Sequence, residues 1–196
     1  MKSYLKHCVR RVLPKLKRQL SLLRHAKWMQ QGKLLAHHTS TLAGVGCSVS
    51  SLAALCSFKQ RKGPFLLLAS DMSSALKWAR YISPALRQFL QHGWPDKTTL
   101  IFPAKKGLDA CLYQQGMIAV RVDSDLNCCF LAKEMGGCFV SSSLNRRGQR
   151  TKTPICQQAW RWQRFQMRSL VNKSHQHCEQ ASTILRVTRL GMQRLR

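Results

Sequence analysis

Acidic residues are scarce in this sequence of 196 residues. Only 7 Asp and Glu face 33 Lys and Arg, which gives a formal net charge of +26. No acid precedes Asp71, and the segment from Asn145 to Arg196 contains only Glu179. A surface with so few carboxylates attracts polyanions over long distances. We therefore expect general affinity for RNA, with an anionic membrane surface as the second candidate.

Long apolar runs are absent as well. The run Phe65–Ala69 is far shorter than the roughly 20 residues that a membrane-spanning helix needs, so we expect no transmembrane segment. No uninterrupted apolar stretch follows the basic N-terminus, which argues against a secretory signal. With 44% hydrophobic residues in 22.4 kDa, the chain has enough apolar side chains for the core of one soluble domain.

The nine cysteines form no C-x-x-C pair, and their number is odd. Both features argue against a disulfide framework, and stretches such as "NCCFLA" place thiols among apolar residues, where they act as small hydrophobes. We therefore expect a reduced chain in the cytoplasm. His175, His177 and Cys178 lack a second ligand pair at zinc-finger spacing, so no metal site is predicted.

The N-terminal segment carries apolar residues near helical spacing between Leu5 and Leu23, with Lys and Arg between them. This pattern is typical of an amphipathic docking helix, but a basic, acid-free start is also typical of an organellar targeting segment, and both readings stay open. Pro14 predicts that a first helix ends there and that a second begins near Lys15. We assign residues 1–20 to a basic extension and residues 21–196 to a single domain.

Expected strands and helices alternate through the rest of the chain. The pattern predicts strands at residues 33–39, 65–70, 98–104, 117–122, 137–143 and 181–187. It predicts helices at 50–58, at 74–93 with a break at Pro84, and at 127–136, and a glycine-bearing turn at 43–48. Such alternation is typical of an α/β or α+β fold, here a twisted mixed β-sheet flanked by helices.

Polar side chains follow or interrupt these apolar strands at four places. Arg121 is the most informative, because a guanidinium between two valines must reach water or pair with an anion. Cations, hydroxyls and an amide together describe a pocket for a ligand that bears phosphates and a carboxylate. No Walker motif and no catalytic triad occurs, so no catalytic residue is assigned. The four places are the stretches "HTSTLAGVG", "KQR", "AVRV" and "SSSLNRRG".

Six short motifs occur in a characteristic order: "AHHTSTLAGVGCS", "KQR", "WPDKTTLIF", "AVRV", "SSSLNRRG" and "ASTI". In order and wording they resemble the YrdC/TsaC-type threonylcarbamoyl-AMP synthases, single-domain forms of the Sua5/YciO/YrdC family. The resemblance runs from about Lys33 to the C-terminus. It implies a mixed sheet flanked by helices, with a concave basic face.

The resemblance also implies an activity. It indicates a nucleotidyltransferase that condenses L-threonine, bicarbonate or CO2 and ATP, accompanied by Mg2+, into threonylcarbamoyl-adenylate and diphosphate. A downstream enzyme then transfers the threonylcarbamoyl group to an adenosine beside the anticodon of tRNA. Such an enzyme is expected in the cytoplasm, or in an organelle if the N-terminal extension is a targeting segment.

The resemblance assigns roles to six residues by their place in the motifs. Lys59 and Arg61 correspond to a phosphate-binding pair, and Ser143 and Asn145 to residues that contact the nucleotide of ATP. The remaining two, which correspond to binders of threonine or its carbamate, are Thr39 and Arg121.

The chain also departs from the family pattern. Ser40 stands where the motif has a glutamate, and His38 and Ala181 each replace a proline. Loss of a carboxylate from the expected pocket leaves an alternative, a weakened or inactive homologue that acts as a basic RNA-binding protein. A third hypothesis is carbamoyl-adenylate chemistry with another acceptor, as in hydrogenase-maturation relatives, whose zinc-finger cysteines this chain lacks.

Overall fold

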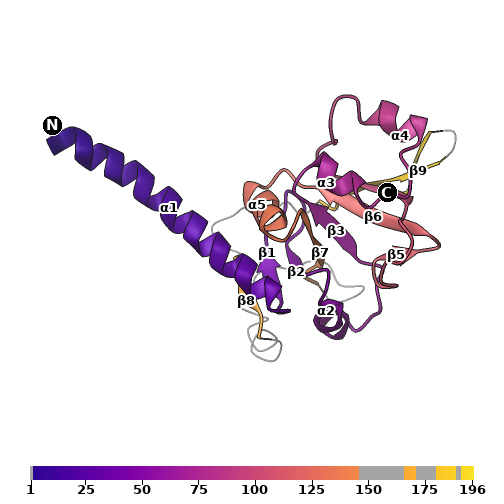
Figure 1. The fold of residues 1–196 in the computed structure, drawn as a ribbon, viewed down its shortest axis with the longest axis horizontal. Helices are drawn as coiled ribbons and strands as arrows, with labels where there is room; N and C mark the ends of the chain where they lie inside the picture. Colours follow the sequence, from indigo (N-terminus) through magenta and orange to yellow (C-terminus); the bar gives the residue numbers. More distant parts are fainter. Residues whose placement is uncertain (1, 146–165, 171–179, 189–190) are drawn as a thin grey trace.

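The computed structural model describes residues 2–145, 166–170, 180–188 and 191–196, with the side chains of the first helix described from Pro14 onward. Helices and strands alternate along the chain (Figure 1). The helices are α1 (Lys2–Gln30), α2 (Leu52–Lys59), α3 (Met72–Leu76), α4 (Pro84–Phe89) and α5 (Leu126–Glu134). The strands are β1 (Leu35–His37), β2 (Gly44–Cys47), β3 (Leu66–Ala69), β4 (Thr98–Pro103), β5 (Tyr113–Gln114), β6 (Met117–Val122), β7 (Cys138–Ser143), β8 (Arg168–Ser169), β9 (Thr183–Val187) and β10 (Met192–Arg194).

The strands form one mixed sheet in the order β10-β9-β4-β6-β3-β7-β2-β1-β8, with β5 paired to β6. The pairs β3–β6, β4–β9 and β1–β8 are parallel, and the remaining pairs are antiparallel. The predicted fold, a mixed sheet flanked by helices, is therefore confirmed. None of the helices in the described ranges combines the length and apolar character that crossing a bilayer requires.

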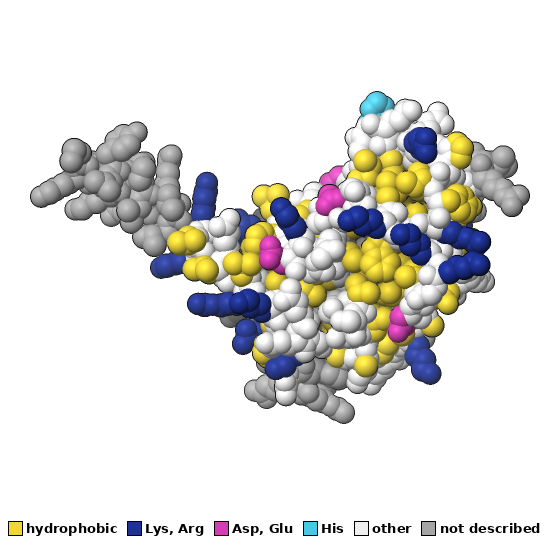
Figure 2. Space-filling model, in the orientation of Figure 1, with side chains coloured by type: hydrophobic (Ala, Val, Ile, Leu, Met, Phe, Trp, Pro, Cys, Tyr) yellow, Lys and Arg dark blue, Asp and Glu magenta, His cyan; other side chains and the backbone are white. Residues whose placement is uncertain are grey.

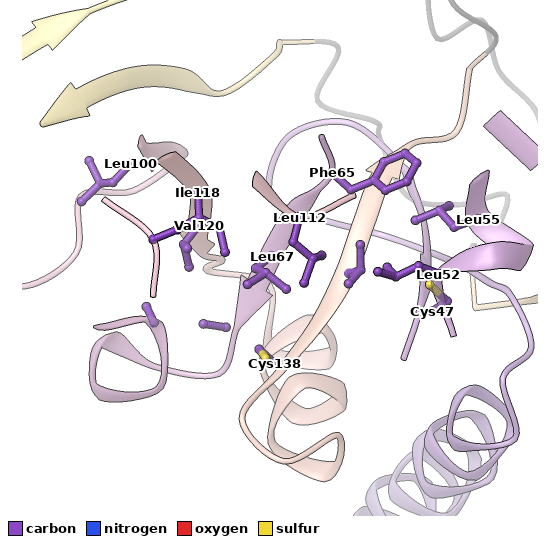
Figure 3. Packing of buried hydrophobic residues seen from close by; sticks show 14 of the residues in the cluster. Cys47, Leu52, Leu55, Phe65, Leu67, Leu100, Leu112, Ile118, Val120 and Cys138 are labelled. Carbon is purple, nitrogen blue, oxygen red and sulfur yellow. The ribbon is translucent and has the colours of Figure 1, made fainter. Parts of the chain in front are cut away.

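One face of the sheet packs against α2, α3 and α4. Successive side chains of a strand point to opposite faces, so every second residue of the central strands falls on this side. Leu67, Val120 and Val140 are fully buried there, together with Leu55 of α2 and Leu86 of α4. Figure 3 shows part of this apolar layer.

The opposite face is only partly covered by helices. Leu68 and Phe139 pack there against Met29 of α1 and Leu131 of α5. The first part of α1 projects away from the sheet (Figure 1), and Arg18 donates two hydrogen bonds to Asn127 Oδ1 of α5. The strand ends that α1 and α5 leave uncovered on this face line a cavity.

Pro14 lies inside α1, so the prediction that a helix ends there is wrong. A proline removes one backbone donor and crowds the preceding turn, which usually kinks or ends a helix. Pro14 is exposed, so the carbonyl that loses its partner can be hydrated, which lowers the cost. The helix runs through residues 20 and 21 without a break, and the division of the chain at that point stays a prediction.

The segment 43–48 was predicted as a turn, and this is wrong, because it contains β2. The glycines that suggested a turn serve close packing instead. A Cβ on Gly46 would lie 2.8 Å from the Phe139 ring and 3.0 Å from the carbonyl oxygen of Val140. Glycine within a strand thus marks a close approach of neighbouring groups rather than a reversal of the chain.

The other predicted elements begin within two residues of their predicted starts, whereas β5, β8 and β10 were not predicted. The break at Pro84 is confirmed, because α4 starts with that proline and Ser83 caps it by accepting the N–H of Leu86. Asp71 and Asp125 cap α3 and α5 in the same way. The cap on α5 fixes the chain directly after β6, next to the cavity.

Gly46→Ala is expected to lower the free energy of unfolding by about 1–3 kcal/mol, because the added methyl group overpacks against Phe139. Urea denaturation measures the change. In the background of Phe139→Leu, which shortens the opposing side chain, the same substitution should cost clearly less. Equal costs in both backgrounds would contradict the packing explanation.

Candidate functional site

The uncovered part of the sheet holds a cavity of about 290 Å³. Strand alternation explains its lining: Ala119 and Arg121 of β6, and Ser141 and Ser143 of β7, are the residues whose side chains point away from the α2–α4 layer. Among the lining residues of the described chain, the charged ones are Arg61, Arg121 and Arg196.

Arg121 is almost fully buried, with 4% of its surface exposed. Its Nη1 donates to Thr41 Oγ1 at 2.7 Å, and its Nη2 lies 2.9 Å from Oδ2 of Asp123 in an ion pair. The expectation that this guanidinium pairs with an anion is thus met by a carboxylate of the chain itself. Arg121 lines the cavity, and Thr41 and Asp123 hold its guanidinium in place.

Thr39 lies on the turn between β1 and β2 and also lines the cavity. Its hydroxyl donates to the carbonyl oxygen of Leu42 at 2.7 Å and accepts the N–H of Thr41 at 3.1 Å. These bonds stabilise the turn that brings Thr41 to the guanidinium of Arg121.

Lys59 and Arg61 follow one another across the end of α2, where Gln60 takes a left-handed conformation with φ 53°. The turn sends the two side chains to different partners. Lys59 Nζ donates to the carbonyl oxygens of Ser143 and Asn145, at the end of β7. Arg61 lines the cavity, and its guanidinium lies 4.8 Å from the centre of the Phe65 ring.

Ser143 and Asn145 lie at the end of β7. The Ser143 hydroxyl lines the cavity and donates to Oδ1 of Asn145. Lys59 therefore joins this strand end to α2, and the predicted phosphate and nucleotide residues form one connected group. Gly148, the last residue of the predicted loop, lies outside the described residues, as do His175, His177 and Cys178.

The structure thus brings together all six predicted site residues. Thr39, Arg61, Arg121 and Ser143 line one cavity, and Lys59 and Asn145 are bonded to its wall. Arg196 was missed as a third cation; the antiparallel pairing of β10 with β9 brings it beside the "ASTI" motif, where its Nε donates to the carbonyl oxygen of Ser182 at 3.1 Å.

His37 was also missed. It is fully buried, its Nδ1 lies 3.0 Å from the carbonyl oxygen of His38, and its Nε2 lies 3.0 Å from Ser141 Oγ. A carbonyl only accepts, so Nδ1 carries the proton and Nε2 accepts the hydroxyl hydrogen of Ser141. Burial lowers the pKa of His37 from 6.5 to about 4. Residues two apart in a strand share a face, so the sequence could have placed His37 on the same face as Leu35.

A family model agrees with this architecture. The Sua5/YciO/YrdC model, described as telomere recombination, matches residues 27–196. The chain belongs to the Sua5/YciO/YrdC family.

Relatives named threonylcarbamoyl-AMP synthase support this assignment. The protein of that name from Methylococcus capsulatus is 30% identical over 144 residues, covering 69% of this chain and 76% of the relative.

Solved structures of Sua5/YciO/YrdC proteins share the fold. P. abyssi Sua5, crystallised with L-threonine, superposes with a TM-score of 0.78 at 18% identity over 91% of this chain, which spans 54% of that protein. E. coli YciO superposes with a TM-score of 0.76 at 18% identity, covering 91% of this chain and 89% of YciO.

The buried His37 predicts a pH dependence of stability. In the unfolded chain this histidine takes up a proton below pH 6.5, whereas in the folded chain it does so only near pH 4. Stabilisation by the neutral ring is therefore complete above pH 6.5 and is lost as the pH falls toward 4, a loss on the order of 3 kcal/mol.

Urea denaturation of the wild type and His37→Gln at pH 7 and pH 5 measures this loss. The free energy of unfolding should fall more steeply in the wild type, and His92→Gln, at an exposed histidine, is the matched control. Parallel pH profiles of wild type and His37→Gln would show that the ring is not the titrating group.

Proposed function

We propose that this chain is a threonylcarbamoyl-AMP synthase, which forms threonylcarbamoyl-adenylate from L-threonine, bicarbonate or CO2 and ATP. The observation that supports the proposal best is the convergence of Arg61, Arg121, Thr39 and Ser143 on one cavity. The names of the sequence relatives and the threonine complex of P. abyssi Sua5 point to the same substrates.

Groups in the cavity wall and bonded to it suit the two substrates. Arg61 presents cationic donors for phosphate oxygens of ATP, and Lys59 adds positive charge at the end of β7. We assign Ser143 and Asn145, which are bonded to each other there, to contacts with the nucleotide. Arg121 offers donors for the carboxylate or carbamate of threonine, and Thr39, whose hydroxyl hydrogen is bonded to the carbonyl oxygen of Leu42, lines the same cavity.

The chemistry requires little covalent participation by the protein. A carbamate oxygen of N-carboxythreonine attacks the α-phosphorus of ATP, the bond from that phosphorus to the bridging oxygen breaks, and diphosphate leaves. The carbamate forms when the threonine amine adds to CO2 and gives up its proton to solvent. This nucleophile is then an anion, so its attack on phosphorus needs no general base. Arg61 and Arg121 position two negatively charged reactants and offset charge on the phosphates.

Mg2+ enters this proposal with its nucleotide. In the described ranges no group of three His, Cys, Asp or Glu side chains could hold a metal ion. Mg2+ usually keeps several waters and binds substrate phosphates, so a complex of Mg2+ with ATP fits a cavity lined by hydroxyls and cations. The metal ion would supply further neutralisation of phosphate charge.

The product indicates the further partners. Threonylcarbamoyl-adenylate is a mixed anhydride, so a second enzyme that transfers the acyl group to tRNA must consume it, and we place both steps in the cytoplasm. Exposed Lys and Arg far outnumber Asp and Glu on the face shown in Figure 2, which favours contact with RNA.

Purified protein supplied with threonine, bicarbonate and Mg-ATP is expected to release diphosphate in a coupled phosphatase assay. Threonine-independent or absent diphosphate release would rule out the synthase.

Arg61→Ala should weaken ATP binding about tenfold or more, because it removes charge-assisted hydrogen bonds to phosphate. Lys62→Ala removes an exposed cation from the same loop and serves as the control, with ATP affinity unchanged.

The +26 charge also favours a second function, RNA binding without catalysis. Affinity for tRNA in a filter-binding assay should fall by about a thousandfold or more between about 50 and 200 mM salt if six or more phosphates are contacted. Binding that does not respond to salt would exclude an electrostatic RNA interface. RNA binding together with an inactive wild-type enzyme would favour the non-catalytic alternative.

A further inference from the structure

Asp123 is a carboxylate beside the cavity to which the sequence motifs assigned no role. It follows β6 directly, its side chain is fully buried, and it lies beside the arginine that we assign to threonine. We propose that Asp123 is a positioning residue for threonine: it holds Arg121 and the turn of residues 39–42 in the geometry that binds the substrate carboxylate. This inference rests on the proposed function and extends it to a residue with no assigned role.

The carboxylate of Asp123 has three partners from three parts of the chain. Its Oδ2 lies 2.9 Å from Nη2 of Arg121. Its Oδ1 accepts the backbone N–H of Ser40 at 2.8 Å and that of Asp125 at 3.0 Å. One side chain therefore joins β6, the turn after β1 and the start of α5.

Strand geometry explains why these groups meet. Residues i and i+2 of an extended segment point to the same face, so Asp123 lies on the same side of the sheet as Arg121. Thr41 approaches the guanidinium from the turn, and the same turn offers the N–H of Ser40 to the carboxylate. Asp123 thus holds Arg121 and also the turn that carries Thr41, the other partner of the guanidinium.

The pairing has an energetic reason. A buried guanidinium without a counter-charge costs several kcal/mol, which would drive Arg121 toward water and away from its present position. Asp123 offsets that cost, although its contact with Nη2 is an ion pair without hydrogen-bond alignment. The remaining donors of the guanidinium stay available to a ligand.

One of those donors stands out. Arg121 is 4% exposed and lines the cavity, and its Nε–H has no acceptor among the described residues. A buried donor without a partner needs an explanation, and we infer that an oxygen of a bound ligand supplies the missing acceptor. Because Thr41 and Asp123 hold Nη1 and Nη2, a carboxylate oxygen would meet a guanidinium that is already oriented.

Asp123 also bears on the acid missing at residue 40. Ser40 Oγ is buried and has no hydrogen-bond partner in the part of the chain that the structure describes. The backbone of Ser40 is nevertheless bound to a carboxylate, that of Asp123, which comes from β6. The loss of the motif glutamate therefore does not leave this turn without an acid.

Asp123→Asn tests the role while keeping the shape of the side chain. The amide oxygen still accepts from Ser40 and Asp125, but the negative charge beside Arg121 is lost. We expect KM and Kd for threonine to rise about tenfold or more, as for a lost charged partner, while those for ATP change less than about twofold. A purely structural role would weaken both substrates together or lower thermal stability alone.

Two further variants sharpen the result. Asp125→Asn, two residues away, keeps a good helix cap and should leave both affinities unchanged. Asp123→Glu retains the charge and should recover part of the threonine affinity that Asp123→Asn loses. Circular dichroism of each variant shows whether it folds.

Calorimetric titration of L-threonine and of ATP, done separately, distinguishes failure of this inference from failure of the proposed function. If the wild type binds threonine and Asp123→Asn binds it equally well, the positioning role is wrong and the synthase stands. Equal weakening of threonine and ATP also overturns the role. If the wild type binds no threonine and releases no diphosphate, the proposed function is wrong and this inference falls with it.

Discussion

Alternation along the strands is the constraint on which the rest of the structure depends. One set of residues must be apolar to pack against α2, α3 and α4, and the intervening set is then free to be polar wherever α1 and α5 leave the sheet uncovered. Val120 and Arg121 are neighbours in sequence: Val120 packs in the apolar layer, and Arg121 lines the cavity on the other face. A shift of one residue in the register of β6 would bury the guanidinium in the apolar layer and empty the cavity wall.

Two cations, Arg121 in the cavity wall and Lys59 bonded to that wall, are held by the protein itself. Lys59 is bound to two backbone carbonyls, and Arg121 to a hydroxyl and a carboxylate. Fixed donors stabilise charge in a substrate more effectively than mobile ones, because they need no reorganisation when the charge appears. The same bonds link β1, β6, β7 and α2, so the residues that bind a ligand also join distant parts of the fold.

The sequence predicted those features that depend on local pattern. A continuous apolar run predicted β3, and the arginine between valines in β6 predicted a side chain that reaches water or pairs with an anion. It did not predict that α1 continues through Pro14, since that depends on the solvent around the proline. It also did not predict β2, because the glycine at residue 46 is required by the ring of Phe139 on the neighbouring strand. His37 and Asp123 were missed because their partners, Ser141 and Ser40, lie 104 and 83 residues away in sequence.

The projecting helix α1 carries cations outside the cavity. Its 29 residues, at about 1.5 Å each, span roughly 44 Å from end to end, and none of them is acidic. Among its described side chains, those that pack against the sheet are Leu22, Ala26 and Met29, in its C-terminal part. Its exposed cations between Lys15 and Lys27 lie outside the cavity lining, so a polyanion drawn to them would not compete with small substrates for the same donors.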